Sequence, residues 1–297
     1  MKLSRFFELA VRSGIAADPR RAKKNIRGYA DSAVLNGPLT TEVTSILAGI
    51  DMDVPELLLA DRLRRTRRID LVMAHHPQGR ALAGLFGVMQ VQVDVMRNAG
   101  IPERVAQGFL DERRRQVERR LLSANHQRSV DAARLLGLPF ICCHTPADNH
   151  AYRFISRLLE RTRPACLKDI IGILMEIPEY QHAADSLCGP RIILGNPRRP
   201  CGKVLVEMTG GTEGPQNVYK HLYRSGVRTL VSMHLSEDHL KNVTEANLNV
   251  VIAGHISSDT LGMNLLLDNI ARYGDFEIEA ISGFRRITRR GRIRTAR

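Results

Sequence analysis

The sequence predicts an α/β fold made of two similar α/β units, with mixed or parallel sheets and an inserted helical segment. Short apolar runs of strand length alternate with helix-length segments in both halves of the 297-residue chain. This alternation favours strands that pair in parallel through right-handed crossovers. Between the halves, residues 81–136 have a helical composition, and Gly108 is the only Gly or Pro between Glu103 and Leu136.

The first half is expected to form one strand–helix–strand unit after an N-terminal helix. Its expected segments are, in chain order, a helix over 1–14, a basic loop-rich segment over 15–38, a strand over 43–51, a helix over 57–63 and a strand ending at His75. Asp53 is the expected N-cap of the second helix, because a proline and a glutamate follow it closely.

The second half repeats the alternation over a longer stretch. Its expected segments are helices over 152–161 and 167–175, an irregular segment over 176–202, a strand over 203–208, a glycine-rich turn over 209–215, a helix over 216–225, a strand over 227–233, a helix over 237–246 and a strand over 249–253. The turn follows a strand and precedes a helix, which is the context of a phosphate cradle. It lacks the glycine spacing of nucleotide-binding loops, so a tight turn beside a metal pocket is the favoured alternative.

Composition limits the classes of function. Residues 285–297 hold seven arginines and no acid, which accounts for about half of the net charge of +13. This segment is expected to be a flexible tail, either simply solvated or bound to nucleic acid through phosphate contacts. No apolar run reaches about 18 residues, and the N-terminus does not resemble a signal peptide, so we expect a cytoplasmic protein without membrane contact. The five cysteines lack C-x-x-C spacing, which argues against disulfides.

Three apolar strand-like segments end in residues that bind metals. The first ends in His75-His76-Pro77, the second runs into His144-Thr-Pro-Ala-Asp148, and the third into His255-Ile-Ser-Ser-Asp259. Ligands in α/β sheets gather at the carboxyl ends of strands, and imidazole with carboxylate suits Zn, Mn, Fe or Ni. Each segment alone could instead supply a buried core histidine or a helix-capping aspartate. Cys143 is a further candidate ligand, although a small core residue is the expected role.

An ordered set of motifs resembles the family of Ngg-one-interacting factor three (NIF-three-like proteins, also labelled GTP cyclohydrolase type 2-like). The motifs, spread over about residues 43–272, are Gly49-Ile50-Asp51, His75-His76-Pro77, His144-Thr145-Pro146-Ala147-Asp148, Gly210-Gly211-Thr212-Glu213-Gly214 and Ala253-Gly254-His255-Ile256-Ser257-Ser258-Asp259. The last motif departs from the family, which usually has Glu where this chain has Asp259. Because Asp is one methylene shorter, a bridging role would need a backbone shift or would weaken the binding of one ion.

The resemblance implies a site, an assembly and two alternative functions. Residues 1–284 would form one metal-binding domain holding two divalent ions, with His144 beside them as the proton-handling residue. The implied metal ligands are His75, His76, Asp148, His255 and Asp259. Similar proteins form toroidal homohexamers whose metal sites face an internal cavity. The chain would be a metal-dependent hydrolase acting on a nucleotide or other phosphorylated substrate; the alternative is a non-catalytic, ring-forming metal-binding protein that interacts with nucleic acid or protein partners.

Overall fold

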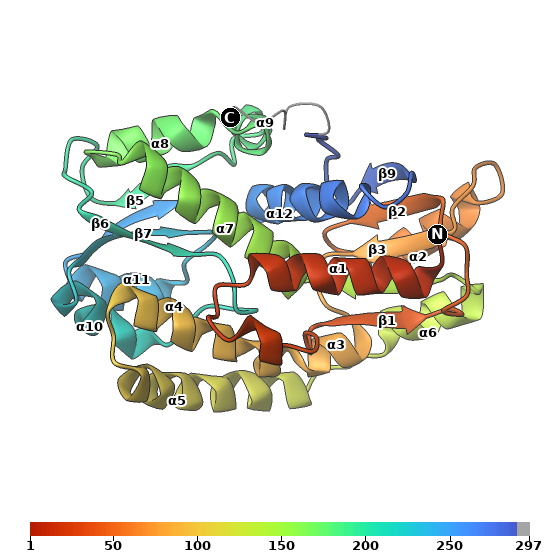
Figure 1. The fold of residues 1–297 in the computed structure, drawn as a ribbon, viewed down its shortest axis with the longest axis horizontal. Coiled ribbons are helices and arrows are strands. Elements are labelled where there is room, and N and C mark those ends of the chain that lie inside the picture. Colours follow the sequence, from red (N-terminus) through yellow and green to blue (C-terminus); the bar gives the residue numbers. More distant parts are fainter. Residues whose placement is uncertain (290–297) are drawn as a thin grey trace.

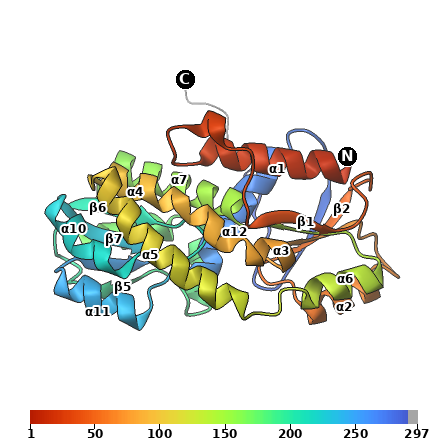
Figure 2. The same ribbon diagram turned by 90° about the horizontal axis from the view of Figure 1, so that it is seen from below.

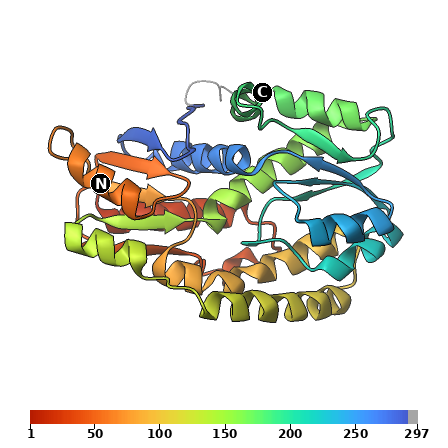
Figure 3. The ribbon, with the colours of Figure 1, turned by 180° about the vertical axis from the view of Figure 1, so that it is seen from behind.

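Two mixed β-sheets lie at opposite ends of the molecule in the computed structural model, which describes residues 1–289 (Figures 1 and 3). The first sheet has the order β1 (Ser32–Asn36), β4 (Phe140–Cys143), β3 (Leu71–Ala74), β2 (Ser45–Gly49) and β9 (Glu277–Ile281). The second has the order β5 (Arg191–Leu194), β8 (Asn249–Ile252), β7 (Val227–Ser232) and β6 (Lys203–Glu207).

The two sheets share one topology, which confirms the predicted pair of similar units. In each sheet the first strand along the chain, β1 or β5, is an antiparallel edge beside the fourth, β4 or β8. The remaining strands pair in parallel, and β9 adds a fifth strand beside β2. Both antiparallel edges also contain a register shift, between Val34 and Asn36 and between Ile192 and Leu194.

Helices cover both sheets and connect them. They are α1 (Leu3–Ala17), α2 (Val54–Leu63), α3 (Gly79–Ala83), α4 (Val91–Ala99), α5 (Glu103–Leu122), α6 (Arg128–Leu136), α7 (Thr145–Thr162), α8 (Leu167–Met175), α9 (Pro178–Asp185), α10 (Tyr219–Arg224), α11 (Glu237–Glu245) and α12 (His255–Ile270), with short 3-10 helices η1 (Lys23–Asn25), η2 (Leu85–Gln90) and η3 (Gln216–Val218). The expected insertion over 81–136 is helical, and its α4 and α5 run alongside each other over the second unit (Figure 2).

Two long helices, α7 and α12, cross between the sheets. Helix α7 follows β4 of the first sheet, but its Ile155 and Leu159 belong to the core of the second sheet. Helix α12 follows β8 of the second sheet, but its Met263 and Leu267 belong to the core of the first. A Cβ at Gly262 would lie 2.5 Å from the carbonyl oxygen of Ala147, so only glycine permits this close crossing.

The structure differs from the sequence prediction at three edge strands and at helix boundaries. Strand β1 lies within the segment expected to be loop, β5 within the segment 176–202 expected to be irregular, and β9 after the last expected strand. These strands are four or five residues long and sit at sheet edges, where a half-exposed side-chain pattern such as that of β5 gives a weak apolar signal. Helix α7 begins at Thr145 rather than 152, so Asp148 lies in its first turn.

The start of the arginine-rich segment is bound to the domain, in contrast to the flexible tail expected from residue 285. Arg286 pairs with Asp268, and the two Nη atoms of Arg289 lie 2.7 and 2.6 Å from the Glu179 carboxylate. The rest of the expected tail, residues 290–297, lies outside the described residues. Within the described part of the chain, no helix has both the length and the apolar character to cross a membrane.

We expect Gly262→Ala to lower the free energy of unfolding by about 1–3 kcal/mol, because the added methyl group overpacks the crossing of α7 and α12. Gly172→Ala is the matched control: it lies in α8 with open space at its Cβ position, and should raise stability by roughly 0.5–1 kcal/mol. Denaturant unfolding of both variants measures the difference. Equal stability changes would mean that the crossing tolerates a wider spacing.

Candidate metal centre

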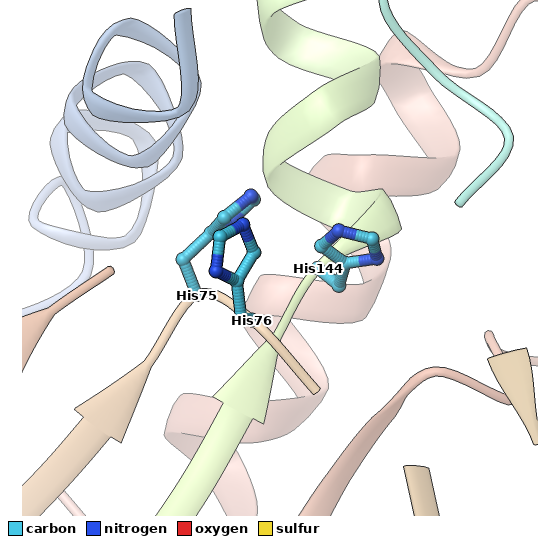
Figure 4. Close-up of side chains that lie close together, drawn as sticks. All are labelled: His75, His76 and His144. Atoms are coloured by element: carbon cyan, nitrogen blue, oxygen red, sulfur yellow. The ribbon is translucent and has the colours of Figure 1, made fainter. Parts of the chain in front are cut away.

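The histidine pair follows β3 directly, at the carboxyl end of the first sheet. The backbone amides of His75 and His76 donate to the carbonyl oxygens of Gly49 and Ile50, which keeps both residues in register with β2. Pro77 has no amide hydrogen with which to extend that ladder. Figure 4 shows the rings of His75 and His76 close together, with His144 from the end of β4 nearby. The ring centroids of His75 and His144 are 4.9 Å apart.

The first turns of α7 and α12 bring the two carboxylates to the same place. In both helices a histidine at the start is followed four residues later by an aspartate, which puts the two side chains on one face. His255 Nε2 lies 3.4 Å from Asp259 Oδ2, and His144 Nε2 lies 3.7 Å from Asp148 Oδ2. The two units therefore contribute the same His-x-x-x-Asp arrangement from opposite sides of the crossing.

Asp259 belongs to two separate groups of donor atoms. Its Oδ1 lies 3.4 Å from His75 Nε2, which in turn lies 3.4 Å from Asp148 Oδ1. Its Oδ2 lies 3.4 Å from both His76 Nε2 and His255 Nε2. Both trios lie within the spacing at which side chains hold a metal ion. The structure thus brings together all five residues expected as ligands, with Asp259 shared between the two groups.

The centre of the cluster is buried and its polar atoms lack partners. His75, Asp148 and Asp259 are 0%, 5% and 1% exposed. Neither ring nitrogen of His75, neither oxygen of Asp259 nor Oδ1 of Asp148 has a hydrogen-bond partner among the described residues. Leaving buried polar groups unpaired costs several kcal/mol unless another partner binds them. A cation is the partner that would satisfy imidazole nitrogens and carboxylate oxygens at once.

Burial and the neighbouring charges shift the pKa values of this cluster in opposite directions. Burial lowers the pKa of His75, but Asp259 and Asp148 outweigh it and raise that pKa to about 10. For Asp259, burial raises the pKa, whereas His75, His76 and His255 outweigh burial and hold the pKa well below its usual value. In the absence of a cation, these shifts favour a protonated His75 beside a charged Asp259.

Two further aspartates orient the imidazoles of His76 and His144 through their Nδ1 atoms. Asp51 lies 2.6 Å from His76 Nδ1, and Asp31 lies 2.8 Å from His144 Nδ1. Asp31 also accepts hydrogen bonds from the amide and hydroxyl of Thr145, which fixes its own position. In the sequence, Asp51 is recognisable only as part of a motif. Asp31 is not recognisable as a site residue, because it lies in the segment expected to be loop. The β1 strand signal was too weak to bring it to the sheet.

A small cavity of about 50 Å³ opens beside the cluster. Asp148 and Asp259 line one side, and Glu207, Glu213 and His234 of the second unit line another. Glu213 lies 3.5 Å from the Nδ1 of His234, and burial together with Glu213 raises the pKa of Glu207 to about 7. No Lys or Arg of the described chain lines this cavity. His234 and Glu207 were not identified from sequence, since neither occurs in a motif with recognisable spacing.

The glycine-rich turn and Cys143 do not add ligands. Gln92 donates to the carbonyl oxygens of Gly210 and Thr212, which fixes the turn against α4. A Cβ at Gly210 would lie 2.5 Å from the Gln92 side chain, and the φ of Gly210 is +101°. The turn is therefore a tight turn that forms one wall of the cavity. Cys143 is fully buried in the apolar core of the first sheet, where burial raises its thiol pKa.

Comparisons with known proteins agree with this architecture. A NIF3 superfamily protein from Sphaerobacter thermophilus superposes with a TM-score of 0.80 and is 30% identical, with 94% of this chain and 97% of that chain covered. Reduced HcgD from Methanocaldococcus jannaschii superposes with a TM-score of 0.58 over 94% and 97% of the two chains. Its identity of 14% makes this a likeness of fold alone.

The sequence by itself matches no family model and no curated protein. The identity and near-complete coverage of the Sphaerobacter protein, together with the duplicated sheets, confirm the family that the motifs predicted. This chain belongs to the NIF3 superfamily.

Proposed function

We propose that the protein binds two divalent metal ions and is a metal-dependent hydrolase acting on a nucleotide or other phosphorylated substrate. The observation that carries the proposal is the sharing of Asp259 between two donor trios. His75, Asp148 and Asp259 Oδ1 would hold one ion, and His76, His255 and Asp259 Oδ2 the other. A carboxylate shared in this way is the usual means of keeping two ions close enough to act together.

The donor atoms fit such ions in spacing and chemistry. Donors on a tetrahedral ion with bonds of about 2.1 Å are separated by about 3.4 Å. That spacing equals two of the three donor separations in each trio, such as the 3.4 Å from His75 Nε2 to Asp259 Oδ1. Imidazole and carboxylate together suit Zn, Mn, Fe or Ni, and the identity of the metal is left open. The ions would satisfy four of the five orphaned atoms: His75 Nε2, Asp148 Oδ1 and both carboxylate oxygens of Asp259.

The bound ions would supply Lewis acidity, which lowers the pKa of water and neutralises charge on a phosphoryl group. His144 is the residue we assign to proton transfer. Asp31 accepts from its Nδ1, so Nε2 is left to take up and release a proton on the side of the cavity. Burial lowers the pKa of His144, but Asp148 and Asp31 outweigh it and raise that pKa, which makes the ring a ready proton acceptor.

The lining of the cavity limits how a phosphorylated substrate binds. Because no Lys or Arg of the described chain reaches it, a phosphoryl group would depend on the ions for its charge partner. The hydroxyls of Thr209 and Thr212 and the carboxylates of Glu207 and Glu213 then face the rest of the substrate. A screen of nucleotides, phosphomonoesters and oligonucleotides with and without added metal tests the activity. If the protein with both metal ions bound hydrolysed none of these compounds, the proposed hydrolase activity would be rejected.

Asp259→Asn should reduce the metal content from two ions per chain to fewer than one, since both trios lose their shared charge. Asp259→Glu keeps the carboxylate and should retain metal. The exposed Asp185→Asn is the matched control and should bind as the unchanged protein does. Elemental analysis after dialysis measures the content, and circular dichroism checks that each variant is folded. If Asp259→Asn still bound two metal ions per chain, Asp259 could not be a carboxylate that both ions require.

His144→Gln should lower kcat by about 10²–10⁴-fold on any substrate found, because an amide can bind Asp31 but cannot take up the proton. The metal content should stay unchanged, which separates proton transfer from metal binding. His182→Gln, on the exposed side of α9, is the control. Loss of metal together with activity in His144→Gln would make His144 a ligand instead.

We further propose that the protein is a homohexamer, as the family resemblance implies. The measurement is multi-angle light scattering at micromolar concentration. The expected mass is six times the 33.3 kDa of one chain. A monomer under these conditions would reject the assembly while leaving the metal assignment intact.

A further inference from the structure

We propose that a groove between α1, α7 and α12, separate from the metal centre, binds short single-stranded nucleic acid. The groove has a volume of about 560 Å³. Its walls come from the last turns of α1, the middle and end of α7 and the second half of α12, which lie together in Figure 1. No residue of the candidate metal centre lines it. The site therefore does not depend on the proposed hydrolase.

One wall carries a row of arginines with unused charge. Arg153, Arg157 and Arg161 occur at every fourth position of α7, so each is about 6 Å along the helix from the next. No described carboxylate forms an ion pair with any of these three. Arg153 donates instead to the carbonyl oxygen of Ala16, to which Lys23 also donates, at 2.7 and 2.9 Å. Three arginines thus line one rim, and Lys23, which lies near Asp18, adds a fourth cation beside it.

The floor of the groove is apolar and includes an aromatic ring. Phe154 lies between the arginines in the sequence, and Leu158 and Leu265 continue the surface. The Arg289 guanidinium lies over the Phe154 ring, 5.8 Å from its centroid, so a stacked base would share this ring with Arg289 or displace it. His150 forms a 2.8 Å hydrogen bond with Ser13, so this end of the groove is polar but has no acid. Asp and Glu are absent from the lining within the described chain. A basic rim around an aromatic floor is the arrangement that binds single strands, because phosphates pair with guanidinium groups and bases stack on rings.

Other occupants match these features less well. The chain's own residues 290–297 carry four further arginines and no acid, so their charge is not complementary to the groove. An acidic peptide would pair with the arginines, but its carboxylates carry no aromatic ring to stack on Phe154. A nucleic acid strand provides both a regular row of negative charge and planar bases.

The test is fluorescence anisotropy of a labelled ten-nucleotide oligothymidine with the full chain at several salt concentrations. Arg157→Gln/Arg161→Gln removes two exposed cations that form no described hydrogen bond, so the fold should be kept. We expect at least tenfold weaker binding, and a salt slope reduced by about 1.4 because two phosphate contacts are lost. Arg115→Gln/Arg119→Gln, with the same spacing on the exposed face of α5, is the matched control and should change neither quantity.

Three further measurements can overturn the proposal. Phe154→Leu should weaken oligothymidine binding about fivefold or more and leave the binding of inorganic polyphosphate unchanged; equal affinity for oligothymidine would mean that only charge is recognised. Chelation of metal should leave the affinity for oligothymidine unchanged. Loss of binding after chelation would mean that the strand binds at the metal centre. Polyglutamate of equal charge should compete poorly. Equal competition by polyglutamate, equal weakening in the α5 control, or no binding by the unchanged protein would each reject the site.

Discussion

The burial of two carboxylates without hydrogen-bond donors is the constraint on which the site depends. Asp148 and Asp259 are almost completely enclosed, and three of their oxygens have no partner among the described residues. The surrounding imidazoles supply positive charge only when protonated, as the raised pKa of His75 indicates. Metal cations can neutralise the carboxylates while leaving the imidazoles neutral. The electrostatics of this chain therefore favour a cation as the partner of these carboxylates.

The duplicated architecture explains how the site is assembled. Each unit ends its last central strand in a histidine that starts a long helix, and each helix places an aspartate four residues later. Because α7 and α12 cross at Gly262 and Ala147, the two aspartates meet rather than facing separate sheets. The shorter acid of this chain still reaches both donor trios, since both Asp259 oxygens lie 3.4 Å from their imidazoles.

The sequence predicted the parts of this account that depend on local chemistry. Apolar strands ending in His75-His76, His144 and His255 were recognisable because strand-end ligands interrupt an apolar pattern. Asp31 was missed because its effect arises from an antiparallel edge strand that joins β4 across 100 residues of sequence. Glu207 and His234 were missed for a similar reason: the cavity wall forms only when the second sheet is brought beside the helix crossing. These three residues reach the site through contacts between distant parts of the sequence, which their residue types alone do not indicate.

The most direct test of the shared carboxylate is anomalous diffraction from crystals of the metal-loaded protein. The account predicts two peaks, one bounded by His75 Nε2, Asp148 Oδ1 and Asp259 Oδ1, and one bounded by His76 Nε2, His255 Nε2 and Asp259 Oδ2. Asp259 should contact both peaks, at bond lengths of about 2.0–2.2 Å for zinc. A single peak would contradict the two-ion site, and two peaks of which only one contacts Asp259 would contradict the shared carboxylate.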